Sequence, residues 1–399
     1  MRLLNSMKVL DFSKLLPGPY ATMMLADLGA EILRVESPDL PDFIRQLEPL
    51  DGEDSATHQH LNRSKKSISL NLKKREAVEL VKQLVKDYDI VLEQFRPGVM
   101  ERLGLDYETL REANPKLIYC SLTGYGQTGP YRDRPGHDNN YLSVAGIAEY
   151  SARKNERPAP MGIQIADIAG GSLHSVIAIL TAVIHRGSTG EGQYIDLSMT
   201  DSSFALNAMF GPGYLSSGGV EPKPEGTELN GGTFYDYYKT MDGRYFSVGS
   251  LEPPFRKRLC KGLGISHLID LAEGTGSEEK RLFKEAVREA FLEKTYDEWV
   301  AIFKDIEACV EPVLKFSEAI EHPQIKARNM IVDVPKSDGT FQRQIASPIK
   351  STAYKQKYKS IGGKRGENTV EILREIGLTK EKINELIDKD LFGLVKEHR

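Results

Sequence analysis

Short apolar runs alternate with helical patterns along the first half of the chain. The runs typical of buried strands cover residues 8–12, 31–36, 68–72, 90–94 and 117–122. Between them, apolar residues recur at helical spacing over residues 20–28, 75–86 and 99–103. This alternation predicts a mostly parallel sheet with helices on both faces. Ligands of such sheets bind beyond the carboxyl ends of the strands.

The longest helical pattern covers residues 168–186. Its first residues, 169–172, are small enough for another backbone or a ligand to approach closely. Residues 193–197 then predict one more strand, and residues 201–209 predict a helix. Residues 211–232 are rich in Gly, Pro and Ser, so we expect a linker there.

The pattern changes after the predicted linker. Residues 234–240 and 245–248 flank Asp242 and Gly243, which is a strong hairpin signal. Helical segments follow over residues 254–262, 278–293 and 296–303. They indicate a smaller α+β domain that ends near Val313.

The C-terminal part predicts two more helices. One covers residues 369–376, after Asn368 and with Glu371 at capping-box spacing, and the last covers residues 380–391. Taken together, we expect a large domain over residues 1–210, a linker over 211–232, a small domain over 233–313 and a return segment over 314–399.

Composition and charge narrow the class of protein. A chain of 399 residues exceeds what one hydrophobic core usually supports. A net charge of −4 argues against a general nucleic-acid binder. Cys120, Cys260 and Cys309 are too far apart for a disulfide framework or a zinc site, and we expect them to be buried in a protein from a reducing compartment. The apolar run 177–184 is too short to cross a bilayer and no signal sequence is evident, so a cytoplasmic protein without membrane contact is expected.

Polar residues stand at three unusual places. A dense polar loop, Gly-His-Asp-Asn-Asn-Tyr, occupies residues 136–141. Asp167 lies between apolar neighbours at the start of the long helix, and Glu252 interrupts an apolar run. Each has a structural alternative, because a loop histidine, an aspartate at a helix start and a glutamate before two prolines commonly serve only the fold. No nucleotide-binding, serine-hydrolase or metalloprotease motif accompanies them.

An ordered series of motifs resembles the family III CoA-transferases, and within them the α-methylacyl-CoA racemases. The motifs include Leu-Pro-Gly-Pro at 16–19, Leu-Ala-Asp-Leu-Gly-Ala at 25–30, Phe-Arg-Pro-Gly-Val-Met-Glu at 95–101, Asn-Pro-Lys-Leu-Ile-Tyr at 114–119, the polar loop at 136–141, Ala-Asp-Ile-Ala-Gly-Gly at 166–171, Gly-Glu-Gly-Gln at 190–193, Leu-Glu-Pro at 251–253 and Ala-Cys-Val-Glu-Pro-Val-Leu at 308–314. The resemblance covers nearly the whole chain.

The resemblance implies two alternative enzymes. Racemases of this kind use an aspartate at the position of Asp167 as an acid/base opposite the histidine of the polar loop, here His137, which the glutamate matching Glu252 hydrogen-bonds. Transferases use the same aspartate as a nucleophile and typically lack that histidine. This favours a racemase that inverts the α-carbon of 2-methylacyl-CoA thioesters in lipid metabolism. A CoA-transferase that moves CoA between carboxylic acids is the alternative, and an idle acyl-CoA-binding paralogue is a third.

The chemistry of the three residues agrees with the racemase alternative. Inversion through a planar enolate needs one base on each face of the carbon, and burial and neighbouring charges can tune a His and an Asp toward neutral pH. Backbone N–H groups near Ile168 would stabilise the negative thioester oxygen. No metal or redox cofactor is needed. The acyl group remains open among fatty, bile-acid-like and arylpropionyl chains.

The resemblance also implies a CoA site. It would be formed by Leu70, Asn71, Leu72, Lys73, Arg102, Gly136, Asp138, Asn139, Asn140 and Tyr141. Lys65, Lys66 and Lys74 would either join a positive rim around the CoA phosphates or remain solvated surface residues.

One position departs from the family pattern. Racemases often carry an arginine where this chain has Ser37. We expect Arg45 or Arg63 to supply the missing contact.

The implied fold is α/β, with a Rossmann-like large domain built from both chain ends and a smaller α+β domain between them. The family forms interlocked homodimers in which each active site draws on both chains. His137 and Asp167 would come from the large domain, and Glu252 from the small domain of the partner chain.

Overall fold

The computed structural model describes residues 3–393. The chain forms two compact units, and the first takes the segments up to Ala145, Met161–Leu206 and the chain from Lys326 onward. The second unit takes Gly146–Pro160 and Asn207–Ile325. The predicted linker therefore belongs to the second unit, where residues Gly211–Ser217 form helix α10. The second unit also extends further than the predicted small domain, because it recruits the segment after Ala145 and continues past Val313.

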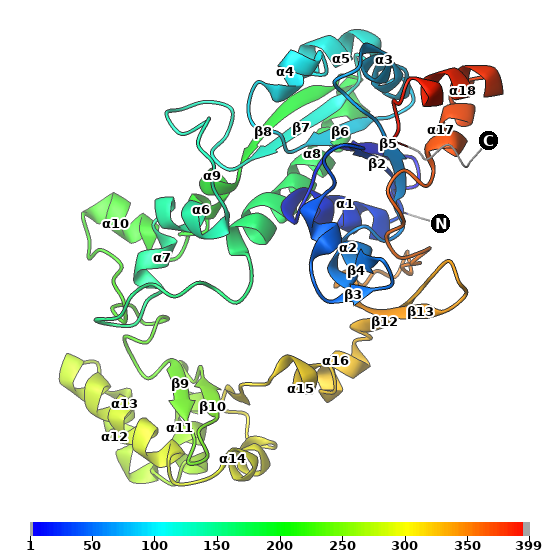
Figure 1. Cartoon of the computed structure of the whole chain (residues 1–399). Coiled ribbons are helices and arrows are strands. Elements are labelled where there is room, and N and C mark those ends of the chain that lie inside the picture. The colour runs from blue at the N-terminus through cyan, green and yellow to red at the C-terminus, as the bar shows by residue number, and fades with distance from the viewer. Residues whose placement is uncertain (1–2, 394–399) are drawn as a thin grey trace. The chain divides into compact units, whose positions relative to one another are not determined.

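A six-stranded parallel sheet organises the first unit (Figure 1). Its strands are β1 (Lys8–Asp11), β2 (Glu31–Glu36), β5 (Lys66–Ser69), β6 (Ile90–Glu93), β7 (Ile118–Thr123) and β8 (Gln193–Ser198). They lie in the order β5-β2-β1-β6-β7-β8. This is the doubly wound order 3-2-1-4-5-6. The winding direction reverses between β1 and β6, so the loops that follow these two strands border the crevice where such folds bind ligands.

Apolar side chains on both faces of the strands explain the helical layers. On one face, Leu10, Leu33 and Val91 are fully buried in a core that includes helices from both chain ends. These helices are α3 (Arg75–Leu84), α5 (Tyr107–Ala113), α17 (Thr369–Glu375) and α18 (Lys380–Asp388). On the other face, α1 (Pro17–Asp27) contacts β1 and α8 (His174–Thr189) contacts β7 and β8. The C-terminal helices thus complete the core of the N-terminal sheet.

Shorter elements surround this sheet. They are η1 (Phe43–Gln46), β3 (Leu50–Asp51), β4 (Asp54–Ser55), α2 (Ala56–Leu61), α4 (Val99–Leu103), α6 (Asp138–Val144), α9 (Met199–Ala205), β12 (Ile331–Pro335) and β13 (Phe341–Ile345). The sequence pattern did not predict most of them, because such short elements contain too few residues to show a recognisable hydrophobic period.

The long helix begins differently from the prediction. Residues Ala166–Leu173 form a π-helix, η2, that continues into α8. A Cβ atom on Gly170 would lie 2.9 Å from Ser203 Oγ, and one on Gly171 would lie 3.1 Å from Pro17 Cβ. The two glycines therefore let η2 lie directly against α9 and α1. By length and composition alone, the stretch Ala166–Thr189 could cross a membrane, a property that core helices of soluble proteins share.

The second unit contains a three-stranded antiparallel sheet with the order β11-β10-β9. Its elements are α7 (Ile147–Tyr150), α10, β9 (Asp236–Lys239), β10 (Tyr245–Val248), α11 (Pro253–Gly262), η3 (Ser266–Leu268), α12 (Ile269–Glu273), α13 (Ser277–Phe291), α14 (Tyr296–Phe303), β11 (Val310–Pro312) and α15 (Phe316–Ala319), and α16 (Pro323–Ala327) crosses the boundary between the units. Gly243 adopts a φ of 85° in the predicted hairpin turn. Phe246, Phe291 and Trp299 are fully buried and form an aromatic core.

Two local predictions were wrong. Asn368 does not cap α17 with its side chain, because its Oδ1 accepts a hydrogen bond from the Ser67 N–H at 2.9 Å and so ties the helix to β5. Cys309 is exposed with a φ of 53°, whereas Cys120 and Cys260 are buried as expected.

Candidate functional site

Asp167 lies in the first turn of η2. Its carboxylate has no hydrogen-bond partner among residues 3–393, so it does not cap the helix, and Ile165 occupies the N-cap position. The Asp167 N–H donates to Asp138 Oδ1 at 3.0 Å. Burial, and then the negative charge of Asp138, raise the pKa of Asp167 to about 6, while His137 opposes the shift. A carboxyl group with this pKa can both take and return a proton near neutral pH.

His137 stands directly before α6, with its side chain exposed. Its backbone N–H donates to Asn140 Oδ1 at 2.9 Å, and the Tyr141 hydroxyl donates to the Gly136 carbonyl at 2.5 Å. A Cβ atom on Gly136 would lie 2.6 Å from the Tyr141 ring. Gly136, Asn140 and Tyr141 were predicted to bind CoA, and in this structure they shape the loop that carries His137.

The structure brings His137, Asp138 and Asp167 together. Asp138 was predicted as a CoA ligand, but its carboxylate is hydrogen-bonded to the backbone of Asp167. Asn139 is exposed on the same helical turn. The predicted N–H groups at the start of the helix are already engaged, because Asp167 donates to Asp138 and Ile168 donates to the Gln164 carbonyl at 3.0 Å. These two donors therefore cannot hold a thioester oxygen in this structure.

Glu252 belongs to the second unit. It is exposed and lies directly before Pro253, the first residue of α11. A proline at the first position of a helix is favoured because its missing N–H would have no partner there. The hydrogen bond between Glu252 and His137 stays a prediction.

The segment that follows β5, residues 70–73, contains both buried and exposed side chains. Leu70 is 1% exposed and packs in the core, and Leu72 packs against the same core. Asn71 donates to Asp39 Oδ2 at 3.2 Å, and only Lys73 is exposed. The Leu70 side chain lies inside the core, and the contact of residues 70–73 with CoA stays a prediction. Arg102 on α4 is exposed, and no ion pair engages it within the described part of the chain.

The lysines expected at a positive rim have other roles. Lys65 is buried, Lys66 forms ion pairs with Glu371 and Glu375, and Lys74 donates to main-chain carbonyls of the C-terminal segment. Lys65 is thus neither a rim residue nor a solvated one. The sequence pattern does not reveal the burial of Lys65, because a lysine between polar neighbours usually reaches solvent.

The two arginines expected to replace the missing contact at Ser37 are not free either. Arg45 pairs with Glu36 at 2.7 Å and with Asp54 at 3.0 Å. Arg63 pairs with Asp27 at 2.6 Å, and its side chain is 1% exposed. The prediction was wrong, because both guanidinium groups neutralise buried carboxylates that the sequence alone does not place.

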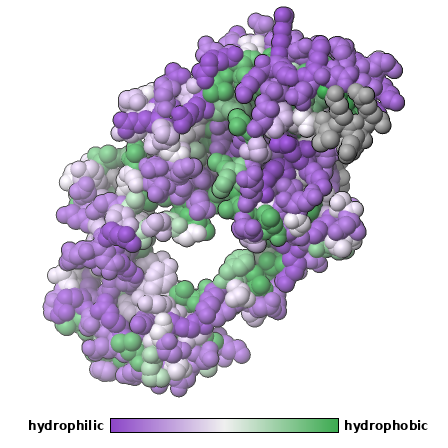
Figure 2. Space-filling view, viewed as in Figure 1, coloured by the Kyte–Doolittle hydropathy of each residue, from purple (hydrophilic) through white to green (hydrophobic). Residues whose placement is uncertain are grey.

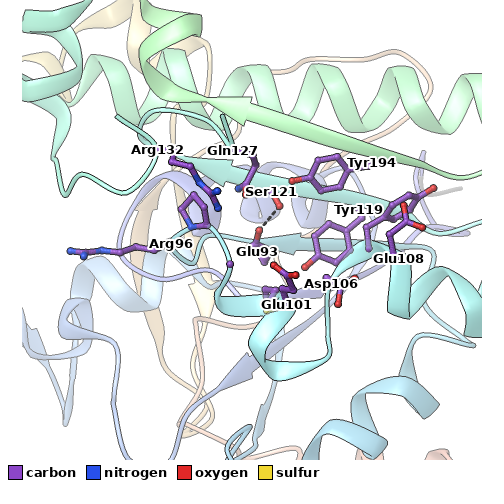
Figure 3. Close-up of a pocket in the computed structure, with 14 residues that line it drawn as sticks. Glu93, Arg96, Glu101, Asp106, Glu108, Tyr119, Ser121, Gln127, Arg132 and Tyr194 are labelled. Carbon is purple, nitrogen blue, oxygen red and sulfur yellow. Dashed lines mark hydrogen bonds between the residues drawn. The ribbon is translucent and has the colours of Figure 1, made fainter. Parts of the chain in front are cut away.

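A cavity of about 570 Å³ opens beside β6, β7 and β8 (Figure 3). Glu93, at the end of β6, is 3% exposed and accepts a hydrogen bond from the Phe95 N–H at 2.8 Å and another from Ser121 Oγ. Burial raises the pKa of Glu93 to about 7. Sequence reasoning missed this residue, although a charged residue that ends an apolar strand was a usable signal.

No cluster of three or more His, Cys, Asp or Glu side chains suited to a metal occurs within residues 3–393. The candidate site brings together the carboxylates of Asp138 and Asp167 and the imidazole of His137.

The family of the chain follows from comparison with known proteins. Residues 4–369 match the model of CoA-transferase family III. The chain belongs to this family of enzymes that act on CoA thioesters, and its large parallel sheet is the one expected for it. A solved CaiB/BaiF family protein from Brucella suis has a similar structure, with a TM-score of 0.80 and 32% identity over 93% of this chain and 98% of that one.

Relatives with two different reactions are almost equally similar to the chain. The α-methylacyl-CoA racemase of Mus musculus is 36% identical over 389 residues, which cover 96% of each protein. The succinate–glutarate CoA-transferase of Agrobacterium fabrum is 35% identical over 387 residues, which cover 94% of this chain and 95% of the relative. The choice of reaction therefore depends on the site.

Proposed function

We propose that the chain epimerises 2-methylacyl-CoA thioesters at the α-carbon. The observation that supports this most is the placement of His137 beside the Asp138–Asp167 pair, with the pKa of Asp167 raised to about 6. One group takes the α-proton, and the other returns a proton to the opposite face of the planar enolate. Neither step breaks the thioester.

Asp138 has a defined part in this mechanism. Its carboxylate fixes the backbone of Asp167 and disfavours ionisation of the Asp167 side chain. A more basic carboxylate is a better proton acceptor. Although the N–H groups of Asp167 and Ile168 are engaged, the positive end of the η2 dipole would still favour the negative charge of the enolate.

CoA would bind in the crevice between the loops after β1 and β6, where the winding of the sheet reverses. Lys73 and Arg102, two exposed cations of the predicted CoA site, would meet its phosphates. Glu252 of a second chain would hold one nitrogen of His137 and fix its tautomer. The reaction requires no metal or redox group, and we place the enzyme in the cytoplasm as a homodimer.

The alternative is a CoA-transferase. The Asp167 carboxylate has no partner in the described structure, so it can also act as a nucleophile, and the transferase of Agrobacterium fabrum is as similar to the chain as the racemase. A transferase would form an acyl anhydride at Asp167 while one CoA leaves and another carboxylate arrives.

One experiment separates the two reactions. One epimer of a 2-methylacyl-CoA is incubated with the pure protein in deuterated water, with no free carboxylic acid, metal or nucleotide. The proposal expects epimerisation together with uptake of one deuterium at the α-carbon. Activity that appears only when a carboxylic acid is added would establish the transferase instead.

A further inference from the structure

Lys65 is a buried cation that the proposed mechanism does not use. Its side chain is 2% exposed, although it precedes β5 at the edge of the sheet. The ammonium donates to the Pro19 carbonyl at 2.9 Å, to Thr22 Oγ1 at 2.7 Å and to Asn62 Oδ1 at 3.0 Å. It also lies 3.4 Å from Asp11 Oδ2. All three N–H donors are thus satisfied, and none is left for a phosphate.

The contacts of Lys65 hold the segment that follows β1, residues 12–19. Asp11 ends β1, and its Oδ1 accepts a hydrogen bond from the Ser13 N–H at 2.9 Å. Lys65 therefore engages the segment at its start, through Asp11, and at its end, through Pro19. A Cβ atom on Gly18 would lie 2.2 Å from Ser13 Cβ, so the segment folds tightly back on itself.

The same segment supports the helix that carries Asp167. Ser172 Oγ is buried and donates to the Pro17 carbonyl at 2.7 Å, and it lies 3.1 Å from the Asp167 carbonyl. Pro17 also contacts η2 where Gly171 leaves no room for a side chain. A continuous chain of short contacts therefore links Lys65 to the backbone of Asp167.

We propose that Lys65 is a positioning residue that fixes the orientation of Asp167 through residues 12–19 and Ser172. An apolar side chain in the same place would fill the volume but leave the Pro19 carbonyl and the Asp11 carboxylate without this donor. Buried ions are weak contributors to stability, and their best-attested use is to specify one arrangement. This inference rests on the proposed function, in which Asp167 exchanges the proton.

Lys65→Met tests the role of the ammonium at nearly constant volume. We expect kcat for α-proton exchange to fall on the order of 10- to 100-fold, the loss typical of a misplaced catalytic group, with KM changed by less than about threefold. Lys66→Met, at the partly exposed neighbouring position, is the matched control and should keep normal kcat. Lys65→Arg retains the charge and should recover part of the loss.

Ser172→Ala cuts the other end of the same chain of contacts. If the two residues act through residues 12–19, the double variant Lys65→Met/Ser172→Ala should lose little more kcat than either single variant. Fully multiplicative losses would overturn the proposal. So would a Lys65→Met protein that is less stable to heat but has normal kcat.

Amide hydrogen exchange tests the link without any activity. We expect faster exchange in peptides that cover Ala166–Leu173 in Lys65→Met, and no change there in Lys66→Met. Unchanged protection of this helix would overturn the proposal. If Lys65→Met does not fold, Thr22→Val removes one contact of the ammonium at constant volume and is judged by the same measurements. A wild-type protein without α-proton exchange would refute the proposed function. The amide hydrogen exchange of Ala166–Leu173 would still show whether Lys65 fixes this helix.

Discussion

At the scale of single residues, carboxylates stand at the carboxyl ends of strands and at the start of η2 in the first unit. Asp11, Glu36 and Glu93 end β1, β2 and β6, and each is at most 5% exposed. Asp11 and Glu36 have cationic partners, whereas Glu93 is bonded only to neutral donors. Asp167 differs from all of them because its carboxylate has no partner within the described residues. An unpaired, half-buried carboxylate beside a histidine is the arrangement that a proton-transfer site needs.

His137 should be required for turnover and dispensable for CoA binding. We expect His137→Ala to lower epimerisation by about 10²- to 10⁴-fold, the usual contribution of a general acid–base group. Calorimetric titration with CoA should give a dissociation constant within about threefold of the wild type. His267→Ala, an exposed histidine of the second unit, is the control. Near-normal turnover of His137→Ala would assign the histidine a structural role.

Asp167 should exchange protons without covalent modification. Hydroxylamine added during turnover is expected to leave Asp167 unchanged by mass spectrometry, because the thioester stays intact. Asp167→Asn should be nearly inactive, since an amide of almost the same shape is too weak a base to take the α-proton. A hydroxamate at Asp167 would show that the side chain is a nucleophile and that the enzyme is a transferase.

The charge of Asp138 should set the acidic limb of the pH profile. Asp138 raises the pKa of Asp167, so Asp138→Asn should lower it. Asp167 then stays ionised to lower pH, and the acidic limb of kcat/KM should move to lower pH. Asp133→Asn, at an exposed position in the same loop, should leave the profile in place. An unchanged or upward-shifted limb in Asp138→Asn would contradict the assignment.

At the scale of elements, the π-helix η2 is the element that carries Asp167, and it is closely packed against its neighbours. Eight residues, Ala166–Leu173, lie between α1 and α9, and their glycines permit contacts that no side chain could make. π-Helical turns are rare and concentrate at functional sites. Asp167 therefore occupies an element whose geometry depends on its neighbours.

A methyl group at Gly170 should disturb both packing and catalysis. Gly170→Ala places a Cβ atom 3.0 Å from the Met199 carbonyl, and we expect it to destabilise the fold by about 1–3 kcal/mol and to lower kcat. Gly187→Ala is the matched control, because it lies on α8 with no atom within 4 Å. That substitution should stabilise the helix slightly, by up to about 1 kcal/mol. Thermal unfolding and initial rates measure both effects, and equal behaviour of the two variants would refute the packing argument.

At the scale of the whole molecule, large apolar side chains are exposed on the first unit, and we expect a partner to cover part of its surface. Ile177 is 60% exposed and Ile184 is 75% exposed on α8, and Phe204 on α9 is 59% exposed. Figure 2 shows that hydrophobic residues (green) also reach the surface among hydrophilic ones (purple) on the face in view. Large exposed apolar patches commonly mark interaction sites. The family resemblance suggests a second copy of the chain as the partner.

Sedimentation equilibrium should therefore give about twice the mass of one chain, 44.6 kDa. Ile184→Glu introduces a charge at the most exposed of these positions on α8 and should weaken the dimer, because an unpaired charge is costly to bury. The matched control is Ser188→Glu, which adds the same charge at an exposed position near the polar end of α8 and should leave the dimer intact. A monomeric wild-type protein at micromolar concentration would refute the dimer.

The local pattern of the chain determined most elements of the large sheet and its helices. Strands such as Ile90–Glu93 and helices such as Arg75–Leu84 bury many of their own apolar residues. The spacing of these residues along the sequence is therefore enough to predict such elements. The order of the motifs, together with Asp167 and His137, was also sufficient to indicate the family. The secondary-structure elements and the family motifs are both defined by residues that are close together in the sequence.

Only the tertiary structure decided the roles of residues whose partners are distant in sequence. Lys65, Arg45 and Arg63 are charged and unremarkable in the sequence, yet each is buried against carboxylates from other segments. Asp138 lies against Asp167, 29 residues further along the chain, because η2 folds against α6. A side chain's burial and electrostatic field arise from atoms that the fold brings together, and local spacing contains no information about them.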